Sequence, residues 1–293
     1  MDIIINGILL GTAFSMMGMG FALLFGVGKV FDLAYGSYYI IVPYIAVALA
    51  PLFYFRFGLG LAFLIALVAV AVFGYLLHRF LINPIRNRPM NIFIMTIALA
   101  VIIQELMVVI WGSSDTNIPS VWAGTTIILG VTVLNQKLAI MLVSLVTIFL
   151  LWLFLTKTKV GLAIRVVAES PQVAKIVGIK INKVYAITAI VGAVISGLSG
   201  FFMCSIYSAN PFSWMEAMTV GFLVIVMAGL GNMWGVIPAG LIMGVIETLV
   251  SFSFPQGAYM KRPVVLIILI LLLIFRPHGL FGVKGWVEEE KQV

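Results

Sequence analysis

The chain has few charged residues and few of the side chains that build catalytic or metal centres. Only 9% of its 293 residues are Asp, Glu, Lys or Arg, against about 25% in soluble domains. Its single cysteine, Cys204, excludes an intrachain disulfide and a cysteine metal cluster. The two histidines, His78 and His278, have no partner at ligand spacing, and no G-x-x-x-x-G-K-[ST] phosphate loop is present. We therefore predict no catalytic residues, no metal site and no cofactor.

Apolar residues are abundant instead. They make up 63% of the chain, and the mean hydropathy is +1.22. No soluble globule could bury that much apolar surface, and a membrane-crossing helix needs about 20 apolar residues. The sequence predicts an all-α polytopic membrane protein, one domain over 1–293, with about 8–10 transmembrane helices and at least one broken or re-entrant segment. The candidate spans are 4–26, 37–54, 58–80, 91–111, 138–156, 184–206, 216–232, 234–252 and 262–275.

The net charge of +7 comes from loops rather than from a basic stripe interleaved with aromatics. Nucleic acid is therefore not an expected partner, and the positive-inside rule accounts for the pattern. The basic residues gather after the third span, in a loop at 157–183 and in the tail at 276–293. These three segments fall on one side of the membrane if nine spans are present. The N-terminus is then outside, the C-terminus is cytoplasmic, and 112–137 is an external loop.

The loop at 157–183 is the longest polar segment between two apolar ones and carries six of the seventeen Lys and Arg residues. Ser170 can cap a helix N-terminus, Pro171 suits the first helical position, and Gly178 suits the position just past a helix end. The pattern predicts a short helix with Val173, Ile176 and Val177 on an apolar face. Such a capped helix on a loop between spans is typical of a docking element.

Three acidic residues are predicted at or near membrane depth, where a charge costs about 2.5–3.5 kcal/mol and usually faces a cavity or a partner. Asp32 lies in a Gly-bounded break, GKVFDLAYGSYY, which would leave backbone groups to line a cavity. Asp32 could equally pair with Lys29. Glu105 and Glu247 lie within spans, where interhelical hydrogen bonds are the simpler interpretation. Small residues four apart, such as Gly192, Ser196 and Gly200, predict close helix packing.

Four ordered segments carry a family resemblance. They are FGVGKVFDLAYGSYY, GLAIRVVAESPQVAKIVGI, MAGLGNMWGVIPAGLIMGVIE and FRPHGLFG. Together they resemble the permease family of branched-chain amino acid ABC importers. The first is similar to the family's N-F-A-H-G stretch, with Asp32 for the Asn and Tyr35 for the His. The second is similar to the family's G-x-x-x-R-A-x-x-E-D pattern followed by an A-x-x-x-G-I helix, which Gly161, Arg165, Glu169, Ala174, Gly178 and Ile179 match. Val166 and Ser170 depart from this pattern.

The resemblance implies a mechanism, a location and a set of partners. Two permease chains, the same or homologous, would form the pore in the cytoplasmic membrane of a bacterium or archaeon. ATP-binding cassette ATPase subunits would bind beneath it, and an extracytoplasmic binding protein would deliver substrate. Basic residues of the loop could also contact lipid phosphates. The coupling residues would be Gly161, Arg165, Glu169, Ser170, Pro171, Val173, Ala174, Ile176, Val177 and Gly178. The substrate path would include Asp32, Tyr35, Gly36, Ser37, Glu105 and Glu247.

Branched-chain or other hydrophobic amino acids are the first expectation for the substrate, and another small polar solute such as urea, an amide or a nucleoside is the second. Two other classes stay open. A secondary transporter would use an ion gradient through Asp32, Glu105 and Glu247 and would need no ATPase. A membrane-embedded enzyme would need a nucleophile–base or metal constellation, which the sequence does not display.

Overall fold

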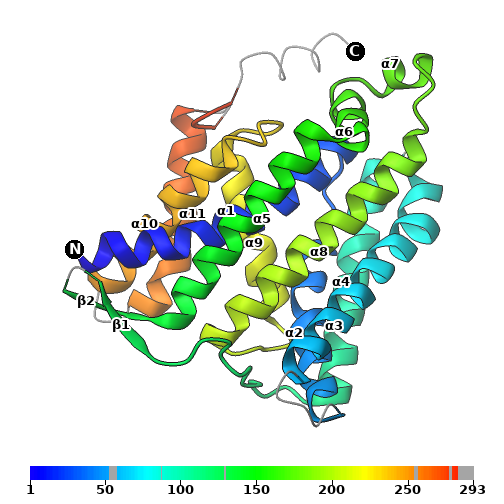
Figure 1. Ribbon diagram of the computed structural model, residues 1–293. Coiled ribbons are helices and arrows are strands. Elements are labelled where there is room, and N and C mark those ends of the chain that lie inside the picture. The colour runs from blue at the N-terminus through cyan, green and yellow to red at the C-terminus, as the bar shows by residue number, and fades with distance from the viewer. Residues whose placement is uncertain (53–57, 87, 129, 254–256, 277–278, 283–293) are drawn as a thin grey trace. The chain divides into compact units, whose positions relative to one another are not determined.

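The computed structural model describes residues 1–52, 58–86, 88–128, 130–253, 257–276 and 279–282. Helices dominate these residues (Figure 1). The helices are α1 Asp2–Gly28, α2 Tyr35–Leu49, α3 Gly58–Leu77, α4 Pro89–Trp111, α5 Asn135–Lys157, α6 Lys159–Glu169, α7 Pro171–Ile176, α8 Ile181–Tyr207, α9 Ser213–Ala228, α10 Val236–Ser253 and α11 Gly257–Phe275. One hairpin is formed by β1 Thr125–Ile128 and β2 Val131–Leu134.

The all-α polytopic prediction is confirmed. Within the described residues, 7 helices are long and apolar enough to cross a membrane, and α9 and Pro263–Phe275 are shorter apolar helices. Each predicted span coincides with one helix, displaced by a few residues at its ends. The predicted break after the first span is also present, because α1 stops at Gly28 and α2 begins at Tyr35. Most of the predicted tail, with Lys284 and Lys291, lies outside the described residues, as does His278.

The chain divides into two compact units, each assembled from distant segments. Unit 1 comprises Met1–Ala22, Trp122–Val146 and Thr219–Val293. Unit 2 comprises Leu23–Val121 and Thr147–Met218.

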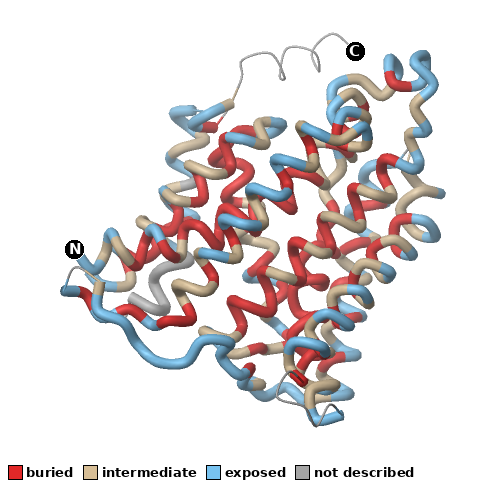
Figure 2. Tube along the Cα trace, in the orientation of Figure 1, coloured by how far each residue is buried: buried red, intermediate tan, exposed pale blue. Residues whose placement is uncertain are grey.

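Unit 2 is built around α8, which packs against α2 and α3. The small residues of α8 allow this close approach. Ser196 Oγ donates a hydrogen bond to the Tyr35 carbonyl at 2.8 Å, and Gly200 lies directly against the Tyr39 carbonyl. Burial agrees with this central position of α8. Helix α8 is mostly buried, while α3 and α4 expose much of their surface (Figure 2). Two residues of the predicted four-residue spacing, Ser196 and Gly200, therefore face α2, whereas Gly192 lies against Leu24 of α1.

Unit 1 joins α1 to α10 through glycines. A side chain at Gly11 would meet the Leu241 backbone, and one at Gly244 would meet the backbone of Gly11. Ser15 Oγ adds a hydrogen bond to the Ile237 carbonyl at 2.9 Å. The hairpin also packs on α1, because Val131 and Val133 form a buried cluster with Leu9.

The hairpin is the main element that the sequence prediction missed. Its strands are antiparallel, with Thr125 opposite Leu134 and Ile128 opposite Val131. A signal was available, since TTIILGVTVL is rich in β-branched residues on both sides of Gly130. In β2 burial alternates, with Val131 and Val133 inside and Thr132 and Leu134 outside.

Candidate functional site

Two specific contacts fix the start of helix α6 and its position against α5. The Thr158 side chain accepts a hydrogen bond from the Gly161 N–H at 2.9 Å, which caps the helix. Gly161 itself lies against the Phe154 carbonyl at the end of α5, where a larger side chain would collide. Arg165 and Glu169 point from α6 into solvent. The glycine therefore sets how closely the loop approaches α5, and the two charged residues remain accessible.

Helix α7 has the start and the stop that the sequence predicted. The Ser170 hydroxyl accepts from the Val173 N–H at 3.4 Å, and Pro171 occupies the first turn. At the other end, the Gly178 N–H donates to the Lys175 carbonyl at 3.0 Å and the Ile179 N–H to the Ala174 carbonyl at 2.9 Å. This Schellman pattern requires a left-handed residue, and Gly178 has φ +81°.

The surface of α7 is apolar and open. Ala174 is fully buried and anchors the helix, whereas Val173, Ile176 and Val177 are 50%, 85% and 70% exposed. Within unit 2, α7 lies beyond the ends of α6 and α8, at the tip of the loop that joins them (Figure 1). Lys175 and Lys180 are exposed beside it. An exposed apolar face flanked by cations, on a helix fixed at both ends, is suited to bind a groove on another protein.

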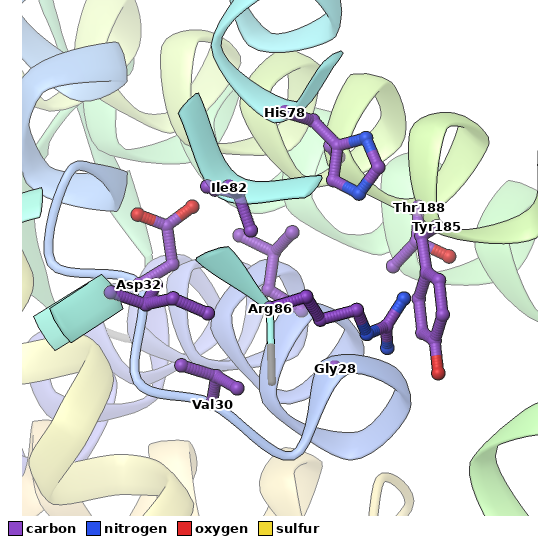
Figure 3. A pocket seen from close by; sticks show the side chains of 11 residues that line it. Gly28, Val30, Asp32, His78, Ile82, Arg86, Tyr185 and Thr188 are labelled. Carbon is purple, nitrogen blue, oxygen red and sulfur yellow. The ribbon is translucent and has the colours of Figure 1, made fainter. Parts of the chain in front are cut away.

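A second candidate site is a small, open pocket of unit 2 with a cavity volume of about 50 Å³. It lies between the end of α1, the break at 29–34, the turn at 78–86 and the first turns of α8 (Figure 3). Its lining is Leu24, Gly28, Val30, Asp32, His78, Ile82, Arg86, Ile92, Tyr185, Thr188 and Ala189. Val30 and Asp32 of the predicted break belong to this lining, and the role of Asp32 in a substrate path stays a prediction.

The charged groups of this pocket have distinct partners. Asp32 is 8% exposed and its carboxylate accepts a hydrogen bond from the Ala34 N–H at 3.0 Å. Burial raises the pKa of Asp32 to about 6. The Arg86 guanidinium lies over the ring of Tyr185, and burial lowers the pKa of Arg86. The Tyr185 ring also lies 6.3 Å from the His78 ring, centroid to centroid.

The three residues after the break serve packing. Tyr35 and Ser37 are fully buried, and Gly36 lies against the Trp214 carbonyl. None of the three belongs to the pocket lining. Their inclusion in the substrate path stays a prediction.

The acids of the later spans, Glu105 and Glu247, do not belong to the pocket lining. Glu105 is exposed on α4 and accepts a hydrogen bond from Gln104 Nε2 at 3.0 Å. The Gln104 oxygen in turn accepts from Trp214 Nε1 at 2.7 Å, which links α4 to α9 as an interhelical bond. Glu247 is buried in α10 of unit 1. The sequence indicated no site role for the pocket residues Arg86, Tyr185 and His78. The contact of Arg86 with Tyr185 joins positions about a hundred residues apart, which no local pattern predicts.

The chain is similar in sequence to known proteins along most of its length. The model of the family described as "Branched-chain amino acid transport system / permease component" matches residues 3–273. The high-affinity branched-chain amino acid transport system permease protein LivH of Escherichia coli K12 is 26% identical over 290 residues, which cover 94% of each chain. BraD of Pseudomonas aeruginosa, named likewise, is 27% identical over 293 residues, covering 95% of this chain and 94% of its own.

A probable branched-chain amino acid transport permease protein, LivH of Methanocaldococcus jannaschii, is 28% identical over 284 residues, covering 92% of this chain and 88% of its own. No solved structure matches.

Proposed function

Since the chain belongs to the branched-chain amino acid transport permease family, we propose that it forms the membrane pore of an ABC importer whose ATPase subunits bind α7. The observation that carries the proposal is the exposed apolar face of α7. The side chains of Val173, Ile176 and Val177 are exposed. The helix that carries them has an N-terminal cap, a buried alanine and a glycine at its end. Exposed aliphatic groups in a fixed geometry favour burial in a partner's groove.

The partners follow from what this chain lacks and offers. It has no phosphate-binding loop, so ATP hydrolysis comes from separate ATP-binding cassette subunits. A second permease chain, the same or homologous, completes the pore, and an extracytoplasmic binding protein delivers the substrate. Arg165 and Glu169 flank the docking face, where they can pair with charges of the ATPase rim. Exposed Lys180 and Lys183 are available to acidic groups of the partner or to lipid phosphates.

The substrate that we propose is a branched-chain or other hydrophobic amino acid, carried inward. The names of the relatives support this choice, because the LivH and BraD proteins are named for branched-chain amino acid transport. A small polar solute such as urea, an amide or a nucleoside is the competing substrate class. Asp32 would line the path near its break, and Glu105 and Glu247 would contribute polar groups along it.

We place the protein in the cytoplasmic membrane with the loop at 157–183 on the cytoplasmic side, as ATPase docking requires. The positive-inside rule supports the same orientation. The N-terminus is then outside, and the C-terminus is inside.

The test is purification in mild detergent from the native membrane, with partner identification by mass, for wild type and two variants. Ile176→Asp places a charge on the α7 face at a side chain that is 85% exposed, so folding should be unaffected. Ile127→Asp is the matched control, because this isoleucine is 73% exposed on the hairpin. We expect a P-loop ATPase to co-purify with wild type and Ile127→Asp and to be depleted at least tenfold with Ile176→Asp.

Two results would contradict the proposal. Equal recovery of the ATPase with Ile176→Asp would remove α7 as the docking element. A wild-type chain that purifies alone, and that transports in vesicles under an ion gradient without ATP, would establish a secondary transporter. Uptake of leucine against urea and a nucleoside in vesicles that contain the purified complex and its binding protein separates the two substrate classes.

A further inference from the structure

The pocket of unit 2 holds a carboxylate and a guanidinium that the proposed docking function does not use. They belong to different segments, since Asp32 lies in the break between α1 and α2 and Arg86 follows the turn at 78–85. Both line the same pocket, and Figure 3 shows the Arg86 guanidinium turned toward Tyr185 and away from Asp32. The third wall comes from α8, which begins directly after the loop that carries α7.

Arg86 is engaged by α8. Its guanidinium lies over the Tyr185 ring, an arrangement in which the ring's negative face attracts the cation. Arginine remains charged even when half-buried. Tyr185 is only one turn from the start of α8 at Ile181. Tyr185 therefore lies in the part of α8 that a movement of the loop at 157–183 would reach first.

Asp32 has no cationic partner among the residues that the structure describes. Its carboxylate is satisfied by one backbone N–H, that of Ala34. A buried carboxylate is stabilised strongly by a nearby cation, and Arg86 is the cation that lines the same space. His78, on the same turn as Arg86, and Tyr38, in α2, are the other titratable groups close to the pair.

The loop is mechanically connected to this arrangement. Both α6 and α7 contact α8 within unit 2, and α8 carries Tyr185 as well as Thr188 and Ala189 of the pocket lining. A displacement of α7 can therefore shift the Tyr185 ring. The guanidinium would then be free to turn across the pocket toward the break.

We propose that Asp32 and Arg86 form an ion pair in the ATP-bound state, and that Tyr185 is the positioning residue that keeps them apart in the state seen here. Formation of the pair would draw the break at 29–34 onto the turn at 78–86 and close the pocket. The inference rests on the proposed function, because it requires α7 to receive movement from an ATPase. It adds the residues that convert this movement into closure of the permease.

A double-mutant cycle on ATP-driven uptake tests the pair. Asp32→Asn keeps the acceptor for the Ala34 N–H, and Arg86→Gln keeps a polar stem. We expect each single variant to lower uptake about tenfold and the double variant to be no worse than either single. Arg88→Gln is the matched control, since Arg88 is exposed near Arg86. Its effect should be small and should multiply with that of Asp32→Asn. Multiplying effects for Asp32→Asn and Arg86→Gln, about a hundredfold together, would overturn the pair.

Two further variants address Tyr185 and the timing of closure. Tyr185→Phe keeps the ring and should retain uptake, whereas Tyr185→Leu should lose uptake while the assembled complex still hydrolyses ATP. Equal activity of the two variants would remove the positioning role. Asp32→Cys with Arg86→Cys, made in a Cys204→Ser background because Cys204 is the single cysteine, should cross-link faster with ATP than without it. A nucleotide-independent rate would overturn the ATP-linked closure.

Failure of this inference can be told from failure of the proposed function. Wild-type complex that shows ATP-driven uptake supports the proposed function, whatever the cycle shows. A wild-type chain without an ATPase partner would overturn both the proposed function and the ion-pair inference.

Discussion

Gly178 is a single residue on which the stop of α7 depends. Its φ of +81° lies in the left-handed region, and an added Cβ would meet nothing within 4 Å. Replacement by valine therefore strains the backbone without a collision, at about 1–2 kcal/mol. We expect Gly178→Val to unravel the last turn of α7 and to lower stimulation of the ATPase by the permease several-fold.

Gly130 provides a control for that experiment. It has the same φ of +81° and the same open surroundings, but it lies in the turn of the hairpin. Gly130→Val should lower thermal stability by a similar amount and leave ATPase stimulation unchanged. Full stimulation and uptake in Gly178→Val would show that α7 is not the coupling helix.

Asp32 makes stability depend on pH in a predictable direction. Its folded pKa, about 6, is above the ordinary value of 3.8, because burial disfavours the charged form. The folded state therefore binds the proton more tightly than the unfolded state. The contribution of Asp32 to the free energy of unfolding is therefore largest below about pH 4 and is lost as the pH rises through about 6, a change of at most about 3 kcal/mol.

Asp32→Asn removes this dependence while it preserves the acceptor for Ala34. We expect the variant to be more thermostable than wild type at pH 7.5 and equal to it near pH 4. Thermal unfolding of wild type and variant in detergent at several pH values measures this difference in stability. Because the two proteins share His78 and Arg86, the difference reports on Asp32 alone. A difference that does not change with pH would contradict the assignment to this carboxylate.

At the scale of elements, the contact between α2 and α8 depends on the absence of a side chain at Gly200. A Cβ there would collide with the Tyr39 carbonyl, which belongs to the backbone and cannot rotate away. We expect Gly200→Ala to lower the free energy of unfolding by about 1–3 kcal/mol through overpacking. Gly60→Ala, in α3 where an added Cβ meets nothing within 4 Å, should be neutral or slightly stabilising. Equal effects of the two variants on thermal unfolding would contradict the packing argument.

The family motifs acquire a physical meaning at this scale. In unit 1, the Leu280 N–H from the final motif donates to the Met227 carbonyl at 2.8 Å, and Gly279 lies against Gly229. In unit 2, Ser196 from α8 binds the Tyr35 carbonyl beside the break. Thus segments far apart in the sequence form specific backbone contacts, in which glycine and serine are needed for their small size.

For the whole molecule, the proposed orientation predicts which loops face which compartment. Ser114 is exposed in the loop after α4, and Gln172 is exposed on α7. Single cysteines at these positions, in the Cys204→Ser background, can be probed with a membrane-impermeant maleimide. We expect Ser114→Cys to react in intact cells and Gln172→Cys to react only after permeabilisation. The opposite pattern would reverse the topology and would remove α7 from the cytoplasm.

Sequence alone was enough to predict the membrane class, the approximate bounds of the apolar helices and the capped helix at 171–176. These features depend on local composition and on neighbouring residues: a run of apolar residues must leave water, and Ser170, Pro171 and Gly178 act within one or two turns. The break at 29–34 was visible for the same reason, since glycines and an acid interrupt an apolar run.

Which residues meet across the fold became clear from the structure alone. It placed Arg86 over Tyr185 and Asp32 in the same pocket, although about 150 residues separate Asp32 from Tyr185. It also assigned the glycine spacings to their partners, α2 with α8 and α1 with α10. Such pairings depend on the register and direction of packed helices, which a one-dimensional pattern of small and apolar residues leaves open.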